Sequence, residues 1–300
     1  MDFTALQDSL SARPPQSLSV AWAVDLSVLK ACVQAYEAGF VDEIVLTGPS
    51  KDIRATAQQG RLDISAFSIV EADSPQEGAW KAVQLIREGR CSVLMKGHLN
   101  TSVLLRAVLD KEHGIRGTTL LSHIAVIELP TPRLALLTDG AMNIAPDLAQ
   151  KRAILDNAIN FAWSLGIENP RAAVLASIES VNPNMQDTLD AACLTQMGRR
   201  GQFSRPAVVD GPLAFDNAYS LKAAQLKGLE SPVAGKADIF LVPEITAGNI
   251  LYKAFSYVGH LKTAGIIYGA ASPIVLTSRA DTDENKLNSI AVACGAASST

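Results

Sequence analysis

The sequence predicts an α/β fold in which parallel sheets carry helices on both faces. Along most of the chain, short apolar segments with strand character alternate with longer segments of helical periodicity, and this alternation is typical of parallel sheets. Ala, Val, Ile and Leu dominate, whereas aromatic residues make up only 5% of the chain. Small aliphatic side chains suit buried parallel strands. The length of 300 residues is sufficient for two domains.

Strands and helices alternate regularly in the first third of the chain. The clearest helix signal is Ser74 as N-cap, with Pro75 at the first helical position and Glu77 completing a capping box. The expected strands are 19–24, 42–49, 67–73 and 91–97, and the expected helices are 26–39, 74–90 and 100–111.

The alternation breaks at 119–140, where two apolar runs flank a turn that contains proline. This pattern favours a hairpin over a crossover helix, so we expect a domain seam near residue 117. The alternation then resumes with helices at 146–166 and 188–197 and strands at 171–177, 206–211 and 237–243. A final apolar strand, 274–276, precedes a helix in which Leu287, Ile290, Ala291 and Cys294 recur at helical spacing.

Composition and charge exclude several classes of function. The formal net charge is −4 and no basic run reaches five residues, which argues against a nucleic-acid partner. No apolar stretch approaches the ~18 residues of a membrane span, and from the opening MDFTALQDSLSARPP we expect no signal peptide. The four cysteines are far apart without C-x-x-C spacing. We therefore expect a cytoplasmic protein with free thiols and no metal.

Polar residues gather where expected strands give way to helices. In open α/β sheets, ligands bind beyond the carboxyl ends of the strands. Lys96 and Gly97 end one strand, Asn100 and Thr101 open the next helix, and Arg106 follows one turn later. A helix start beside a lysine is a ready anion site. The same residues are also typical of a capped helix with solvated cations, and the pattern alone leaves both interpretations open.

Two further junctions carry candidate binding residues. Asp210 and Gly211 end a strand before a turn that Pro212 starts, and Lys236 precedes the strand at 237–243. Gly248 and Asn249 then open an apolar helix. Ordinary turn and cap chemistry also accounts for these residues.

The last junction has a Ser-Arg pair, Ser278 and Arg279, directly after an apolar strand. Asp281 with Glu284 resembles a capping box, and the acids suit the positive end of the helix. An arginine at that end adds positive charge unless an anion fills the gap. Together, the four junctions indicate a ligand rich in phosphate and polar carbonyls.

These junctions lie in seven ordered blocks that resemble one enzyme family, the phosphate acetyl- and butyryltransferases. The similarity runs over nearly the whole chain. The segments MKGHLNT, AMNIAPD and VNPNM are more similar to the butyryl branch than to the acetyl branch. The blocks are MKGHLNTSVLLRAVLDK, LLSHIAVIELP, TDGAMNIAPDLAQK, VNPNMQDTLDAA, DGPLAFDNAYS, SPVAGKADIFLVPEITAGNILYK and YGAASPIVLTSRADTDENKLNSIA.

The resemblance implies a fold and a reaction. The fold is two α/β domains with a cleft between them, similar to the isocitrate and isopropylmalate dehydrogenases. Residues 1–117 plus 267–300 would form the first domain and 118–266 the second. The reaction is acyl-CoA plus phosphate giving acyl phosphate plus CoA, with no metal and no tightly bound cofactor. Family members are homodimers or larger homo-oligomers.

The resemblance also assigns roles residue by residue. Ser278 and Arg279 match the family's active-site Ser-Arg pair, and Arg106 matches a substrate-binding arginine. Gly248 and Asn249 match a Gly-Asn pair that faces the cleft. Asp210 and Lys236 lie in matching motifs, and Lys96, Asn100 and Thr101 in the block expected to hold phosphate groups.

One position departs from the acetyl branch. A carboxylate seven residues after the serine is proposed there as the base that takes the CoA thiol proton, and this chain has Asn285. We choose Asp281 as the base instead, although it is also a candidate helix cap. The expected mechanism is direct attack of the thiolate on the acyl carbonyl, with Arg279 stabilising the oxyanion. A covalent acyl-Ser278 is the alternative.

Two rival functions remain at this stage. A dehydrogenase on the similar fold would need a divalent-metal cluster of aspartates, for which Asp187 and Asp190 are the candidates. A CoA- or acyl-phosphate-binding protein without catalysis is suggested by Asn285, and the intact Ser278–Arg279 pair argues against it.

Overall fold

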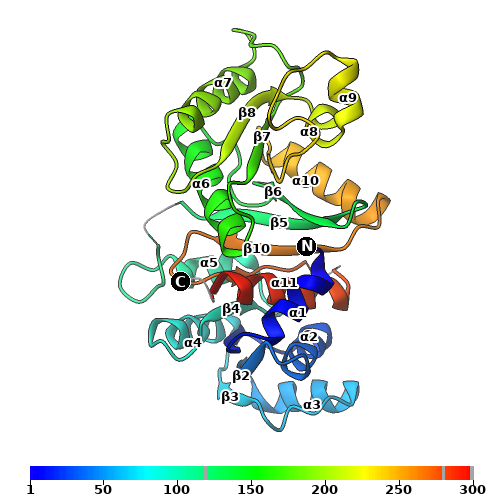
Figure 1. The fold of residues 1–300 in the computed structure, drawn as a ribbon. Coiled ribbons are helices and arrows are strands. Elements are labelled where there is room, and N and C mark those ends of the chain that lie inside the picture. Colours follow the sequence, from blue (N-terminus) through cyan, green and yellow to red (C-terminus); the bar gives the residue numbers. More distant parts are fainter. Residues whose placement is uncertain (118–119, 279–280, 298–300) are drawn as a thin grey trace. The chain divides into compact units, whose positions relative to one another are not determined.

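The structure is a computed structural model that describes residues 1–117, 120–278 and 281–297 (Figure 1). The chain divides into two compact units. Unit 1 comprises Met1–Thr118 with Lys262–Thr300, and unit 2 comprises Thr119–Leu261. The sequence-based domain limits at 117/118 and 266/267 stay a prediction. Within the described residues, no helix is both long enough and apolar enough to cross a membrane.

Unit 1 is built on a mostly parallel sheet with the strand order β3-β2-β1-β4-β11-β10. All neighbours are parallel except β10, which runs antiparallel to β11. The short strands β4 and β11 therefore end at the same edge of the sheet. The strands are β1 (Gln16–Ala21), β2 (Val41–Gly48), β3 (Ser68–Glu71), β4 (Val93–Lys96), β10 (Thr263–Tyr268) and β11 (Ile274–Val275).

The helices of unit 1 form two packed groups. Helix α11 packs on α1 and α2, and α2 contacts α3, whereas α4 packs on α5. Right-handed crossovers place helices on both faces of such a sheet, as the sequence predicts. The helices are α1 (Phe3–Ser11), α2 (Leu26–Glu37), α3 (Ser50–Gly60), α4 (Pro75–Arg87), α5 (Thr101–Val108) and α11 (Asp283–Ala297).

The start of α4 confirms half of the predicted capping box. The hydroxyl of Ser74 accepts the N–H of Glu77, and Pro75 occupies the first turn. The carboxylate of Glu77 does not reach back to the N–H of Ser74 and accepts the N–H of Asp73 instead. The reciprocal bond has therefore moved one residue upstream.

The strands of unit 2 follow the order β5-β6-β9-β7-β8. Strands β5 (Ser122–Leu129) and β6 (Arg133–Thr138) form the predicted antiparallel hairpin. The remaining neighbours are parallel, so β6, β9, β7 and β8 end at one edge. The other strands are β7 (Arg171–Leu175), β8 (Val208–Leu213) and β9 (Ile239–Leu241).

Helices cover the unit 2 sheet. Helices α6 and α7 pack on the strands and on each other, and α8 and α10 also contact the sheet. An aromatic cluster seals part of this core, with Phe215 lying 5.5 Å from both Phe240 and Phe255 between ring centroids. The helices are α6 (Leu148–Ser164), α7 (Gln186–Arg199), α8 (Phe215–Tyr219), α9 (Leu221–Leu226), α10 (Ile245–Lys253) and the π-helix η1 (Ala254–Val258).

Two predicted boundaries in unit 2 are wrong. Strand β8 continues through Gly211 and Pro212 to Leu213, so no turn begins at Pro212. Helix α10 begins before Gly248 and Asn249, because Glu244 is its N-cap and accepts the N–H groups of Thr246 and Ala247. A carboxylate cap therefore replaces the predicted Gly-Asn start.

Candidate active site

The carboxyl ends of β4 and β11 bring two predicted site segments together in unit 1. The strands are parallel neighbours, and Val275 pairs with Met95. Lys96 follows Met95 directly, and Ser278 follows Val275 by three residues. This edge is where open α/β sheets bind ligands. The structure thus brings the Lys96 and Ser278 junctions to the same sheet edge.

Lys96 is a buried cation at the end of β4. Its Nζ donates to the carbonyl oxygens of Gly97 at 3.2 Å and Leu99 at 3.4 Å. The ammonium group therefore holds the β4–α5 loop and adds positive charge beside the start of α5. A buried ammonium next to helix N–H groups favours an anion at that point.

The start of α5 lacks a side-chain cap. Asn100 occupies the N-cap position with extended backbone, but its side chain makes no capping hydrogen bond. The first N–H groups of a helix have no partner within the helix. The interpretation as an ordinary capped helix therefore fails for the Asn100 side chain, and the N–H groups near Thr101 suit an anionic ligand.

Ser278 and Asp281 are joined by two hydrogen bonds. The N–H of Ser278 donates to Asp281 Oδ2 at 2.6 Å, and the N–H of Asp281 donates to the Ser278 carbonyl at 3.2 Å. Ser278 is exposed and Asp281 is half-buried. Arg279 lies outside the described residues, so its predicted role stays a prediction.

Asp281 is not the cap of α11. The hydroxyl of Thr282 accepts the N–H of Asn285 at 3.1 Å, so Thr282 takes the capping role. Glu284 pairs with Lys262 at 2.8 Å instead of completing a capping box. The predicted capping box of Asp281 and Glu284 is therefore wrong. The Asp281 carboxylate instead accepts a hydrogen bond from the N–H of Ser278.

The sequence analysis missed three charged or titratable residues at this edge. His98 Nδ1 lies 3.5 Å from Asp25 Oδ2, and Asp25 precedes α2, next to the end of β1. Burial raises the pKa of Asp25, but the N–H of Val28, contacts with Ser27 and the charge of Lys286 outweigh it, so the pKa is lowered. Lys286 is buried and its Nζ donates to the Asp281 carbonyl at 2.6 Å.

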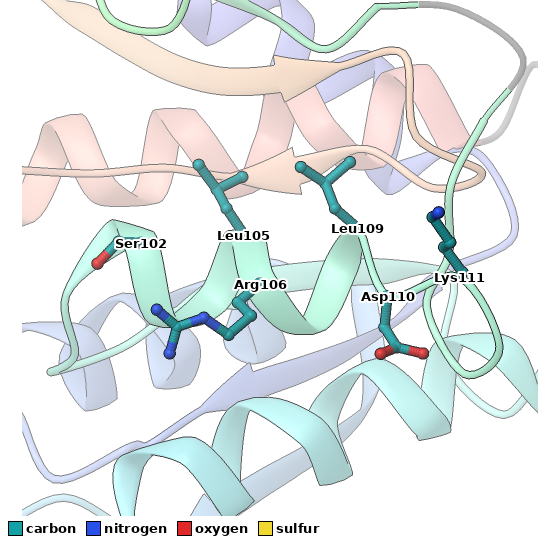
Figure 2. Close-up of a pocket in the computed structure, with 6 residues that line it drawn as sticks. All are labelled: Ser102, Leu105, Arg106, Leu109, Asp110 and Lys111. Carbon is teal, nitrogen blue, oxygen red and sulfur yellow. The ribbon is translucent and has the colours of Figure 1, made fainter.

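Arg106 lines a shallow, open pocket of about 540 Å³ on α5 and the turn after it. Figure 2 shows Leu105 and Leu109 projecting from one side of α5, while Arg106 extends towards the end that carries Ser102. Within the described part of the chain, no hydrogen bond or ion pair engages the Arg106 guanidinium. The remaining lining residues are Asp110 and Lys111.

In unit 2, Gly248 and Asn249 lie against the segment that follows β6. A Cβ at Gly248 would lie 2.7 Å from Gly140 Cα, so only glycine permits this approach. Asn249 Nδ2 donates to the Gly140 carbonyl at 3.3 Å. Asp139, which the sequence analysis did not single out, holds the same segment by accepting the N–H groups of Ala141 and others.

Asp210 and Lys236 flank one loop of unit 2 without contacting each other through a described bond. The hydroxyl of Ser231 donates to Asp210, and Ser231 in turn accepts the N–H groups of Val233 and Ala234. Lys236 is exposed, and its N–H closes the turn onto Val233 at 2.9 Å. The contacts of Asp210 are structural, whereas the ammonium group of Lys236 faces solvent.

Comparison with known proteins identifies the family. The sequence profile described as Phosphate acetyl/butaryl transferase matches residues 74–294. The chain belongs to this family. It is 43% identical to the phosphate butyryltransferase of Clostridium acetobutylicum over 292 residues, 97% of this chain and 96% of that protein. Membership makes the chain a phosphate acyltransferase.

Other relatives of the phosphate acyltransferase span both branches. The phosphate acetyltransferase of Rhizobium meliloti is 42% identical over 283 residues, 94% of this chain and 89% of that protein. A solved branched-chain phosphotransacylase from Enterococcus faecalis has a TM-score of 0.82 at 32% identity, covering 94% of this chain and 99% of that one. Similar identities to both branches leave the acyl preference to experiment.

The phosphate acyltransferase carries a structural asparagine where the acetyl branch is expected to have its base. Asn285 is buried, and its Oδ1 accepts the N–H of Thr263 at 3.0 Å. The amide thus ties α11 to β10. A neutral amide accepts hydrogen bonds but does not take up a thiol proton, so Asn285 does not fit the role of that base.

The dehydrogenase alternative finds no support at its predicted aspartates. Asp190 accepts Lys151 Nζ at 2.7 Å and Gln186 Nε2 at 2.8 Å, so both carboxylate oxygens are engaged. Among residues 1–117, 120–278 and 281–297, no group of three His, Cys, Asp or Glu side chains is arranged to hold a metal ion. Asp190 therefore serves packing between α6 and α7.

Proposed function

We propose that this phosphate acyltransferase interconverts acyl-CoA plus phosphate with acyl phosphate plus CoA, and that it prefers butyryl-CoA to acetyl-CoA. One observation carries the proposal: Lys96, the open start of α5 and Ser278 lie at one edge of the unit 1 sheet. Such an edge combines a phosphate site with a polar group that can contact a reacting carbonyl. The butyryl preference is supported by the MKGHLNT, AMNIAPD and VNPNM segments, whose sequences resemble the butyryl branch more than the acetyl branch.

The catalytic steps are assigned to Ser278, Arg279 and Asp281. In the direction towards acyl-CoA, the CoA thiolate attacks the carbonyl of the acyl phosphate. Arg279 stabilises the developing oxyanion and the departing phosphate, an effect of ~3–4 kcal/mol per donor in comparable sites. Ser278 donates a hydrogen bond to the carbonyl oxygen. Asp281 holds the Ser278 backbone through its 2.6 Å contact.

The substrates are held by cations and open N–H groups. Lys96 and the start of α5, at Asn100 and Thr101, are proposed to bind the phosphate. Arg106 is proposed to bind a phosphate group of CoA, because its guanidinium is exposed beside the apolar surface of Leu105. The substrate-binding roles of Asp210, Lys236, Gly248 and Asn249 stay predictions.

Four broader inferences accompany this function. We infer a likeness to the isocitrate and isopropylmalate dehydrogenase fold, a homodimer or larger homo-oligomer, no tightly bound cofactor and a cytoplasmic location. The last is supported by the thiols. None of the four cysteines forms a disulfide, and burial raises the pKa of Cys32, Cys91 and Cys294 to about 12. Buried, protonated thiols suit a reducing compartment.

The test measures acyl transfer to phosphate from acetyl-CoA and from butyryl-CoA, with the release of CoA as the readout. We expect a higher kcat/KM with butyryl-CoA and a loss of at least 100-fold in Arg279→Ala. Arg87→Ala, which removes an exposed arginine from α4, serves as the matched control. Folded wild-type protein without turnover on either substrate would overturn the proposal in favour of a non-catalytic binding protein.

A second variant separates the two chemical routes. A covalent route through an acyl-Ser278 requires the hydroxyl, so Ser278→Ala would abolish all turnover. Direct transfer uses the hydroxyl only as a hydrogen-bond donor, so we expect Ser278→Ala to retain slow turnover. Rapid mixing with butyryl-CoA in the absence of phosphate checks the same point, because only a covalent route releases a burst of CoA.

A further inference from the structure

A histidine–aspartate pair lies at the sheet edge that carries Ser278. We propose that His98, oriented by Asp25, accepts the proton of the CoA thiol; the inference rests on the proposed acyl transfer. The pair is part of unit 1, and neither residue belongs to the Ser-Arg motif. Four steps support the assignment: position, rigidity, protonation pattern and chemical match.

His98 and Ser278 both follow the carboxyl ends of neighbouring strands. Met95 pairs with Val275 in the parallel neighbours β4 and β11. His98 and Ser278 each follow their paired residue by three positions. Neighbouring strands lie ~4.8 Å apart, so the two segments leave the sheet at adjacent points of the same edge. Both residues are exposed, which leaves them accessible to a substrate.

The backbone holds His98 firmly beside β1. The N–H groups of Gly97 and His98 donate to the carbonyls of Ala21 and Trp22, each at 2.9 Å. A Cβ at Gly97 would lie 2.4 Å from the Trp22 oxygen, so glycine alone allows this contact. His98 is therefore fixed next to the end of β1, close to Asp25.

Asp25 is itself held in place. Its Oδ1 accepts the N–H of Ser27 at 3.0 Å, the hydroxyl of Ser27 at 3.1 Å and the N–H of Val28 at 3.1 Å. These contacts cap α2 and leave Oδ2 directed at His98 Nδ1, 3.5 Å away. The carboxylate therefore favours the imidazole tautomer with the proton on Nδ1, which leaves Nε2 as the proton acceptor.

Several charged groups lie around the pair. The Asp25 carboxylate faces His98 and also feels the positive charge of Lys286. Lys286 donates to the Asp281 carbonyl, and Asp281 in turn accepts the Ser278 N–H. Lys96 is a further cation at this edge, and its Nζ donates to the carbonyl oxygens of Gly97 and Leu99. Lys286, whose charge acts on Asp25, is thus linked to Ser278 through Asp281.

An imidazole matches the chemistry better than a carboxylate does. A thiol of the cysteine type titrates near pH ~8.5, a free carboxylate near ~4 and a free imidazole near ~6.5. Proton transfer from a thiol to a carboxylate is therefore more uphill than transfer to an imidazole. Asn285 removes the carboxylate expected in the acetyl branch, and Asp281 has one oxygen engaged by Ser278.

The step balances without another reactant. His98 Nε2 takes the thiol proton as the sulfur attacks the acyl carbonyl carbon. The new S–C bond forms, the bond between that carbon and the phosphate oxygen breaks, and phosphate leaves with the electron pair. The imidazolium then returns the proton to the phosphate, which regenerates neutral His98. In the reverse direction, the imidazolium protonates the departing CoA thiolate.

The test is the pH dependence of kcat/KM for acyl phosphate plus CoA, measured from pH 5.5 to 9.5. Wild-type activity should fall towards acid pH as the base becomes protonated. In His98→Gln, we expect a loss of about 10²–10⁴-fold at pH 7, with a rate that climbs until the CoA thiol ionises. The Michaelis constants for both substrates should change little, since the lost group acts on the proton.

Four further variants sharpen the assignment. His113→Gln is the matched control, because His113 also lies 3.5 Å from an aspartate, Asp110, but at the far end of α5; it should keep the wild-type profile. Asp25→Asn should lower kcat, because the imidazole loses the carboxylate that orients it. Added imidazole should restore at least tenfold activity to His98→Ala and none to Asp281→Asn.

The outcomes separate this inference from the function on which it rests. Wild-type protein without acyl transfer overturns both. Normal wild-type turnover with an unchanged acid limb in His98→Gln overturns the role of His98 alone. Loss of that limb in Asp281→Asn, with His98→Gln unaffected, assigns the base to Asp281. A raised Michaelis constant for CoA with an intact limb makes His98 a binding residue and likewise overturns the proposal.

Discussion

The amide oxygen of Asn285 accepts the backbone N–H of Thr263 at 3.0 Å, joining the first turn of α11 to the first residue of β10. Asn285→Ala removes this buried acceptor, and we expect it to lower the free energy of unfolding by ~1–3 kcal/mol. Asn285→Asp keeps an acceptor and adds a negative charge near the start of a helix, which is favourable. Urea unfolding of both variants measures the difference.

Asn285→Asp also tests whether the position alone decides catalysis. If His98 is the base, the added carboxylate leaves the acid limb of the pH profile where it was. A new limb at lower pH in Asn285→Asp, with higher activity in acid, would instead mean that a carboxylate here can accept the thiol proton.

Arg106 should act on CoA binding and not on the chemical step. Charge-assisted hydrogen bonds contribute ~1.5–3 kcal/mol, so Arg106→Gln should raise the KM for CoA about 10–100-fold with kcat little changed. The effect should shrink as salt is added, because exposed charges are screened. Initial-rate kinetics at two ionic strengths measure both constants. Arg87→Gln controls for the loss of an exposed arginine, and an equal effect there would contradict a specific role for Arg106.

The buried pair of Lys151 and Asp190 should be needed in unit 2. The side chains are 7% and 5% exposed, and Lys151 Nζ lies 2.7 Å from Asp190 Oδ2. Asp190→Asn leaves a buried ammonium without its counter-charge, so we expect a loss of ~3–5 kcal/mol in unfolding free energy. Chemical denaturation measures it.

The matched control for this pair removes both charges. Lys151→Met with Asp190→Leu fills the site with apolar groups of similar size, and such replacements are often neutral. We expect the double variant to be more stable than Asp190→Asn. A double variant less stable than the single one would mean that the bond from Gln186 to Asp190, not the ion pair, dominates.

Glu244 should make stability depend on pH. The N–H of Thr246, followed by that of Ala247, lowers the pKa of this N-cap carboxylate. Its contribution is therefore present above the unfolded-state pKa of ~4.3 and is lost as pH falls through the lower folded-state pKa. Glu244→Gln removes this dependence. Thermal unfolding from pH 3 to 7 should show the two proteins converging in acid; a constant difference would contradict the cap assignment.

Local patterns predicted the elements whose signals lie within a few residues. Ser74 and Pro75 fix the start of α4 by backbone chemistry alone, and the hairpin of β5 and β6 follows from one proline turn between apolar runs. Helix α3 escaped prediction because only Ile53 and Ala57 of its residues are buried, which gives little periodicity. In α10, Gly248 resembles a helix start but serves close packing on Gly140.

The site was predictable in part for the same reason. Lys96 and Ser278 stand at strand ends that the pattern marks, so their importance could be inferred locally. His98 and Asp25 lie on loops that meet only because β4 joins the sheet beside β1. Strand order depends on the packing of the whole unit, and no local period encodes it. The cap of α11 is Thr282 and not Asp281. Both residues carry a side-chain oxygen that can cap a helix, and sequence spacing does not decide between two such neighbours.

The position of β11 has a consequence for biosynthesis. Strand β11 lies between β4 and β10 in the sheet of unit 1, yet the ribosome makes it after all of unit 2. Unit 2 is continuous and can fold as it leaves the exit tunnel. Until then, the edge of β4 that pairs with β11 has no strand partner, and chaperones can bind it. The same late segment delivers Ser278, so a nascent chain gains its chemistry only when its first sheet is complete.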